Sequence, residues 1–137
     1  WYLGAVENEK VKGFQLTKIH WLKFKSEHFT PQPHITQYFA EEDDVWFSLD
    51  KQIVLLKISA DVSHFFKRRN VLPAQKLIRQ EPNGDLIVQT KMAHENQLFP
   101  LLRYWLPNLT IISPVSLQQL FYQKLNQQII EMKNPLQ

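Results

Sequence analysis

Two short runs of alternating apolar and polar residues face each other across a turn in the second half of the chain. The runs lie at 77–79 and 86–88, and the turn between them reads Pro82-Asn83-Gly84-Asp85. Asn-Gly is a strong hairpin signal because both residue types tolerate the positive φ angles of a tight turn. The pattern therefore predicts an antiparallel β-hairpin over residues 75–92.

The segments on either side of this hairpin mirror each other. Before it, Gln52–Ser59 is a β-branched run typical of a central strand, and Asp61 is the expected N-cap of a helix. After it, we expect a helix capped by Asn96 with Pro100 in its first turn, and then a strand at 109–112. Strand, helix, hairpin, helix, strand is the order of a ferredoxin-like βαββαβ unit, so the fold class is predicted to be α+β.

One more helix is expected after this unit. Ser116 and Gln119 have the spacing of a capping box, and the helix should run to about Met132. Its apolar residues recur every four positions, which predicts one buried stripe. The stripe consists of Leu117, Phe121, Leu125 and Ile129.

The first part of the chain predicts two strands, Trp1–Val6 and Phe14–Phe24, joined by the polar stretch Glu7–Gly13. After them, Pro31 and Pro33 disfavour a helix until a short helical segment at 35–40, and the acidic block Glu41-Glu42-Asp43-Asp44 follows. We therefore divide the chain into a strand pair at 1–25, a linker at 26–50 and a domain at 51–137.

Composition limits the class of protein. The chain has 137 residues, of which 44% are hydrophobic, and no apolar run approaches the ~20 residues of a membrane span. It has no cysteine, which excludes disulfides and thiolate zinc sites. We expect a soluble cytoplasmic protein with no membrane partner. Because the chain opens on Trp1 and not on methionine, we also expect it to be a fragment.

The sequence offers no pattern for catalysis or for a cofactor. The five histidines lack the spacing of metal ligands, and the three glycines cannot form a phosphate-cradling loop. No serine lies in a nucleophile-elbow motif. We therefore predict no enzyme activity, no catalytic residue, no metal and no cofactor.

Two parts of the sequence resemble a known family. Trp1-Tyr2-Leu3, a turn and then Phe14-Gln15-Leu16-Thr17-Lys18-Ile19 resemble the last two strands of the WYL domain, which is named for that tripeptide. Residues 52–132 look like the C-terminal extension that follows WYL domains in bacterial transcriptional regulators. The resemblance implies that the strand pair is the remnant of an Sm-like or SH3-like small barrel. It also implies a winged-helix DNA-binding domain before Trp1. Duplex DNA would be bound only through that domain.

The same resemblance implies a surface for an effector, which in the family includes single-stranded nucleic acid. The corresponding positions are Tyr2, Gln15, Thr17 and Lys18. The family commonly has arginine, leucine, aspartate and arginine where this chain has residues 15–18. Arginine offers phosphate a bidentate fork that lysine and glutamine lack, so a contact here would differ from the family's. The alternative, that these residues are the ordinary polar face of a strand pair, stays open. We expect Trp1, Leu3 and Phe14 in the core.

A second candidate surface is basic. Residues 62–80 contain no acid, and four of their cations could track a phosphate backbone: Lys67, Arg68, Arg69 and Arg79. Cations on a helix are also common as plain solvated surface. Phe65 and Phe66 are expected to pack.

These observations lead to two hypotheses. In the first, the chain is the effector-sensing and dimerising module of a WYL-family regulator, which binds a nucleic-acid oligomer or a nucleotide. In the second, it is a structural dimerisation domain without a ligand. Both expect a homodimer, because an antiparallel sheet with helices on one face leaves its other face open, and an open face or edge is a natural dimer contact.

Overall fold

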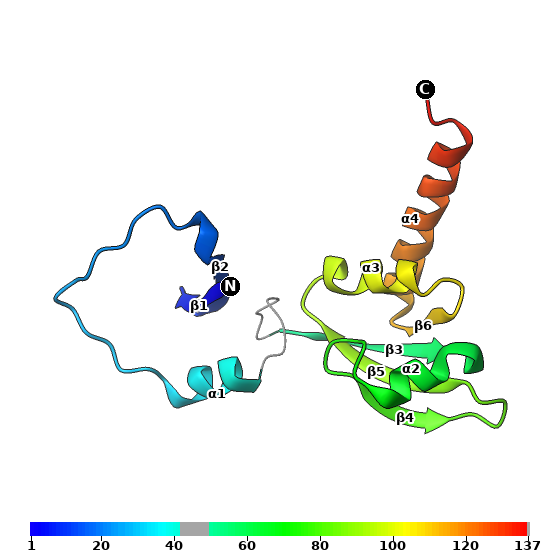
Figure 1. Ribbon diagram of the computed structural model, residues 1–137, viewed down its shortest axis with the longest axis horizontal. Helices are drawn as coiled ribbons and strands as arrows, with labels where there is room; N and C mark the ends of the chain where they lie inside the picture. Colours follow the sequence, from blue (N-terminus) through cyan, green and yellow to red (C-terminus); the bar gives the residue numbers. More distant parts are fainter. Residues whose placement is uncertain (42–49, 137) are drawn as a thin grey trace. The chain divides into compact units, whose positions relative to one another are not determined.

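The computed structural model describes residues 1–41 and 50–136. Between Lys51 and Gln52 the chain divides into two compact units. The first unit contains a two-stranded sheet and the second a four-stranded sheet, each with helices (Figure 1). The predicted α+β class is therefore confirmed.

The second unit has the predicted ferredoxin-like order. Its sheet runs β4-β5-β3-β6 with every neighbouring pair antiparallel. The strands are β3 (Gln52–Ile58), β4 (Lys76–Gln80), β5 (Leu86–Met92) and β6 (Leu109–Ser113). One helix follows β3, another follows β5 and a third closes the unit: α2 (Ser63–Arg68), α3 (Glu95–Tyr104) and α4 (Val115–Lys133).

The core of this unit lies on one face of the sheet. Val54, Leu56 and Ile58 occupy alternate positions of β3, so they share a face, and all three are 0% exposed. Their cluster includes buried side chains from all three helices, which therefore cover this face. The helix residues are Phe66, Leu98, Phe99, Leu102, Leu117 and Phe121. Truncating a side chain such as Leu56 to alanine would cost about 2–5 kcal/mol of unfolding free energy.

The hairpin between β4 and β5 is confirmed, with Leu77 opposite Val88. Within its turn only Gly84 has a positive φ, of 91°. Asn83 instead acts through its side chain, whose carbonyl oxygen accepts a hydrogen bond from the Asp85 amide at 3.1 Å. The turn is thus closed by one glycine backbone and one asparagine side chain.

The caps of α2 and α3 differ from the predicted ones. Asp61 does not cap a helix but lies inside a short 3₁₀ turn, η2 (Ala60–Val62), and the Ser59 hydroxyl accepts a hydrogen bond from its amide. At α3 the cap is His94, whose Nδ1 accepts from the Asn96 amide at 3.1 Å. Because α3 begins before Asn96, Pro100 falls in its second turn and not in its first.

The start of α4 also differs from the expected capping box. Pro114 occupies the cap position, and no side chain makes a capping bond there. Ser116 is already inside the helix, so it cannot pair with Gln119 as a box. The helix ends at Lys133, next to the predicted Met132.

The first unit consists of a β-hairpin and one helix. Its strands are β1 (Tyr2–Glu7) and β2 (Lys10–Gln15), which pair antiparallel. Asn8 and Glu9 form the turn with φ angles of 50° and 63°, so most of the stretch predicted to be a polar connection is strand. The expected strand over 14–24 is wrong, because β2 ends at Gln15 and the chain continues as a 3₁₀ turn, η1 (Leu16–Lys18).

The helix of the first unit is α1 (Pro33–Glu41), which includes the predicted segment 35–40. Pro33 begins this helix and does not exclude it, because proline lacks only an amide that the first turn leaves unbonded anyway. The acidic block starts at the last residue of α1, and its other three residues lie outside the described residues. None of the described helices is both long and apolar enough for a membrane span.

Candidate functional site

The hairpin of the first unit brings the four predicted effector residues to one end. Tyr2 and Gln15 are paired across the two strands. Thr17 and Lys18 follow within η1, which is tied to the start of β1 by a 3.1 Å hydrogen bond from the Leu16 amide to the Trp1 carbonyl. Gln15 is half-buried and the other three are exposed. The arrangement presents one cation and three neutral polar groups to solvent.

The apolar residues of the same hairpin are not buried. Trp1 is 98% exposed, and Leu3 and Phe14 are 47% and 43% exposed, so their assignment to the core is wrong. Two strands and one short helix enclose too little volume to bury large side chains. Val11 is the buried hydrophobic residue in the described part of this unit.

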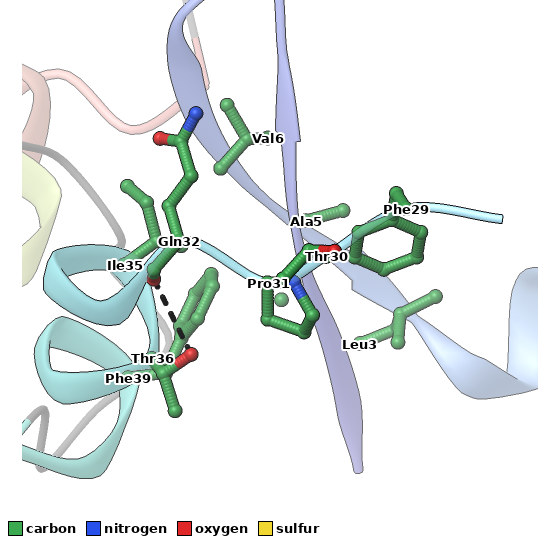
Figure 2. A pocket seen from close by; sticks show the side chains of 11 residues that line it. Leu3, Ala5, Val6, Phe29, Thr30, Pro31, Gln32, Ile35, Thr36 and Phe39 are labelled. Atoms are coloured by element: carbon green, nitrogen blue, oxygen red, sulfur yellow. Dashed lines mark hydrogen bonds between the residues drawn. The ribbon is translucent and has the colours of Figure 1, made fainter.

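A groove of about 740 Å³ lies beside β1 in the first unit. Figure 2 shows it between the strand, the segment 29–32 and the first turns of α1. Gly4 permits this packing, because a Cβ built there would overlap the Phe39 ring. The groove is lined by Leu3, Gly4, Ala5, Val6, Phe29, Thr30, Pro31, Gln32, Ile35, Thr36 and Phe39.

This lining decides what the groove can bind. None of the lining side chains is charged, and the Thr36 hydroxyl already donates to the Gln32 carbonyl. The groove therefore suits an apolar group and offers no cation to a phosphate. Sequence reasoning missed it, although the helical spacing of Ile35 and Phe39 was a signal for an apolar face on α1.

The second unit separates the predicted basic residues. Lys67 and Arg68 lie in the last turn of α2 and Arg69 follows it in extended conformation, so these three are together and exposed. Lys67 donates to the Gln80 side chain at 2.8 Å. Arg79 is the neighbour of Gln80 on β4, so its side chain leaves the opposite face of the strand.

The contacts of Arg79 and of the phenylalanines complete this picture. The Arg79 side chain donates to Glu81 at 2.5 Å. Phe66 is buried and Phe65 half-buried, and both rings lie against Trp105, so their predicted packing is confirmed. Phe65 and Phe66 are therefore occupied within the fold and do not offer a free ring face beside the basic group Lys67–Arg69.

Titratable groups form no reactive cluster in the described ranges 1–41 and 50–136. No group of three histidines, aspartates or glutamates there has the geometry of a metal site. Two carboxyl groups have a lowered pKa. A hydrogen bond from the Ala60 amide lowers the pKa of Asp85, helped by the Asn83 side chain and the charge of Lys57, and Lys12 lowers the pKa of Glu7. Both are structural contacts at hairpins.

A comparison with protein families decides the class of the second unit. The family model of the WCX domain matches residues 50–127, which is more than half of the 137-residue chain. The chain belongs to the WCX domain family. This domain occurs in WYL-family regulators, so the sequence resemblance to the C-terminal extension of such regulators is supported. No curated protein matches the chain.

The WCX match divides the candidate residues into two sets. Lys67, Arg68, Arg69 and Arg79 lie inside the matched range, on α2 and β4 and in the loop between them. The effector residues of the hairpin and the apolar groove lie before it. The match also ends at residue 127, so the last part of α4 lies beyond it.

Proposed function

We propose that this chain is the effector-sensing and dimerising part of a bacterial WYL-family transcription regulator that acts in the cytoplasm. One observation carries the proposal: a WCX domain follows, in the same chain, an antiparallel hairpin that opens with Trp1-Tyr2-Leu3. In this role the chain performs no catalysis. Duplex DNA is bound by a winged-helix domain elsewhere in the regulator.

The proposed effector is a single-stranded nucleic-acid oligomer or a nucleotide. Lys18 and the three cations Lys67–Arg69 are exposed, as phosphate contacts require. Tyr2 is 45% exposed and can offer a ring face to a base. The ligand changes the regulator only if it binds one arrangement of the dimer better than the other.

Binding of labelled single-stranded oligonucleotides at low and moderate salt tests this role. We expect the association constant to fall with salt. A plot of its logarithm against the logarithm of the salt concentration should have a slope of about −0.7 for each phosphate neutralised. Arg68→Glu should weaken binding and flatten that slope. Arg103→Glu is the matched control, because Arg103 is an exposed cation in the last turn of α3, as Arg68 is in α2.

The hairpin surface needs its own pair of variants. Lys18→Glu should weaken binding, whereas Lys25→Glu, another exposed cation of the first unit, should leave it unchanged. Equal effects of both variants would mean that only net charge matters and would remove the hairpin from the site.

The second candidate function is a structural dimerisation domain without a ligand. It is favoured by the polar partners that Lys67 and Arg79 already have in Gln80 and Glu81. The absence of oligonucleotide and nucleotide binding at low salt would leave this function in place of the first.

A further inference from the structure

Helix α4 has two halves with different surroundings. Leu117 and Phe121 are buried in the core, and Leu125 packs against its border. From Asn126 to Lys133 every residue is exposed, so the stripe predicted to be buried ends at Leu125 and does not include Ile129. Figure 1 shows this half, drawn in orange to red, extending away from the sheet of its own unit. The distal half is thus helical without any core to cover.

The exposed apolar residues of α4 repeat at a coiled-coil period. Tyr122, Leu125, Ile129 and Met132 follow one another at steps of three, four and three residues, which are successive a and d positions of a heptad. Leu125 is the half-buried member of this set, because it also packs against the core. Tyr122, Ile129 and Met132 are 46%, 49% and 72% exposed. We call these four residues the α4 seam. The seam touches the core at Leu125, and its other three residues are exposed.

We propose that the α4 seam pairs with the same seam of a second copy of this chain, and so provides the dimer contact of the proposed regulator. The proposal deepens the dimerisation part of that function and rests on it. Apolar residues at alternating steps of three and four form the stripe along which two helices pack in a coiled coil.

The charges flanking the seam favour an identical helix as the partner. Between residues 126 and 136 the only charged residues are Glu131 and Lys133, which have opposite signs. The positions beside the seam include Asn126 and Gln128, which are neutral. Two copies can therefore meet without a row of like charges, in either helix direction.

The open face of the sheet is less suited to self-association. Lys57 is on the face opposite the core, and the strand registers place Lys76, Arg79 and Lys91 on that same face. Two such faces would bring like charges together, which is destabilising. We therefore place the proposed dimer contact on the α4 seam and not on the sheet face.

The size of the seam sets the expected strength. Ten residue steps from Tyr122 to Met132 correspond to about 15 Å of helix. That is short for a stable interface, so the dimer should be weak, with a dissociation constant of about micromolar or higher. The helix needs no nucleation on pairing, because its first half is already fixed on the core.

Sedimentation velocity of the full chain from low micromolar to near-millimolar concentration tests the pairing. Wild type should pass from monomer to dimer over this range. Ile129→Gln should raise the dissociation constant at least about tenfold. The burial of an aliphatic side chain contributes more free energy than a tenfold change in the dissociation constant requires. Ile130→Gln is the matched control: Ile130 is more exposed, at 63%, but lies off the seam.

The outcomes separate this inference from the proposed effector binding. A chain that stays monomeric, or equal effects of Ile129→Gln and Ile130→Gln, would overturn the seam even if oligonucleotides bind. A dimer that is lost only with Ile129→Gln supports the seam even if no oligonucleotide binds. A dimer strengthened by Lys91→Glu and insensitive to Ile129→Gln would place the contact on the sheet face and overturn the proposal.

Discussion

Gln75 is the side chain whose removal should most directly loosen the end of α2. Its Oε1 accepts hydrogen bonds from the amides of Val71 and Leu72 at 3.0 and 3.2 Å. Its Nε2 donates to the Phe66 carbonyl at 2.7 Å. One half-buried side chain thus fixes the last turn of α2 to the loop that leads into β4.

The cost of Gln75→Ala follows from these three bonds. A neutral hydrogen bond contributes about 1 kcal/mol net, and an amide left without a partner costs more where water cannot replace it. Leu72 is buried, at 3% exposed, whereas the end of α2 is accessible to water. We therefore expect Gln75→Ala to lower the free energy of unfolding by about 2–3 kcal/mol. Gln75→Glu keeps the acceptor and loses the donor, so it should lose about 1 kcal/mol.

Urea unfolding followed by far-ultraviolet circular dichroism measures both changes, with the slope of the transition checked for constancy. Gln119→Ala, an exposed glutamine of α4, should stay within about 0.5 kcal/mol of wild type. If Gln75→Ala also stayed within that limit, the Gln75 bonds would not hold the α2 end. Because Lys67 and Arg68 are in the loosened turn, Gln75→Ala should also weaken oligonucleotide binding.

Two further predictions concern the hairpins. Asp85 has a lowered pKa in the folded chain, so its contribution to stability is present above its ordinary pKa of 3.8 and is lost as pH falls through the lower folded value. Asp85→Asn should therefore lose less unfolding free energy than wild type when the pH falls from neutral to acidic. If the variant and wild type lost the same amount, the stabilising role of the Ala60 contact would be contradicted. Gly4→Ala should displace the Phe39 ring and speed amide hydrogen exchange in α1, whereas Gly13→Ala, at the exposed partner of Gly4 on β2, should not.

Chain order alone predicted the second unit, because its signals were local and agreed with one another. Pro82-Asn83-Gly84-Asp85 defined the reversal, and apolar periodicity on both sides distinguished strand from helix. The helix starts were missed where a different residue made the cap. His94 caps α3 through a ring nitrogen, which no common capping pattern includes. Ser59 caps only η2, and α2 has Val62 at its cap position without a side-chain bond.

The first unit was harder to predict because its pattern lacks a buried face. Alternation continues past Gln15 in the sequence, but β2 ends there and the chain continues as the 3₁₀ turn η1. Trp1, Leu3 and Phe14 are typical core residues by type, yet burial depends on the volume that surrounds them. Only one wall of the apolar groove had a signal in the sequence, the helical spacing of Ile35 and Phe39, because segment 29–32 has no periodicity of its own.

The two units differ in what stabilises them, and this difference bears on function. The second unit has a continuous core from three of its four strands and from three helices, whereas the predicted effector residues Tyr2, Gln15, Thr17 and Lys18 are on a hairpin with little buried surface. Segments that bind ligands are often among the least stable parts of a fold. A ligand that binds only the folded hairpin stabilises it by an amount that grows with ligand concentration.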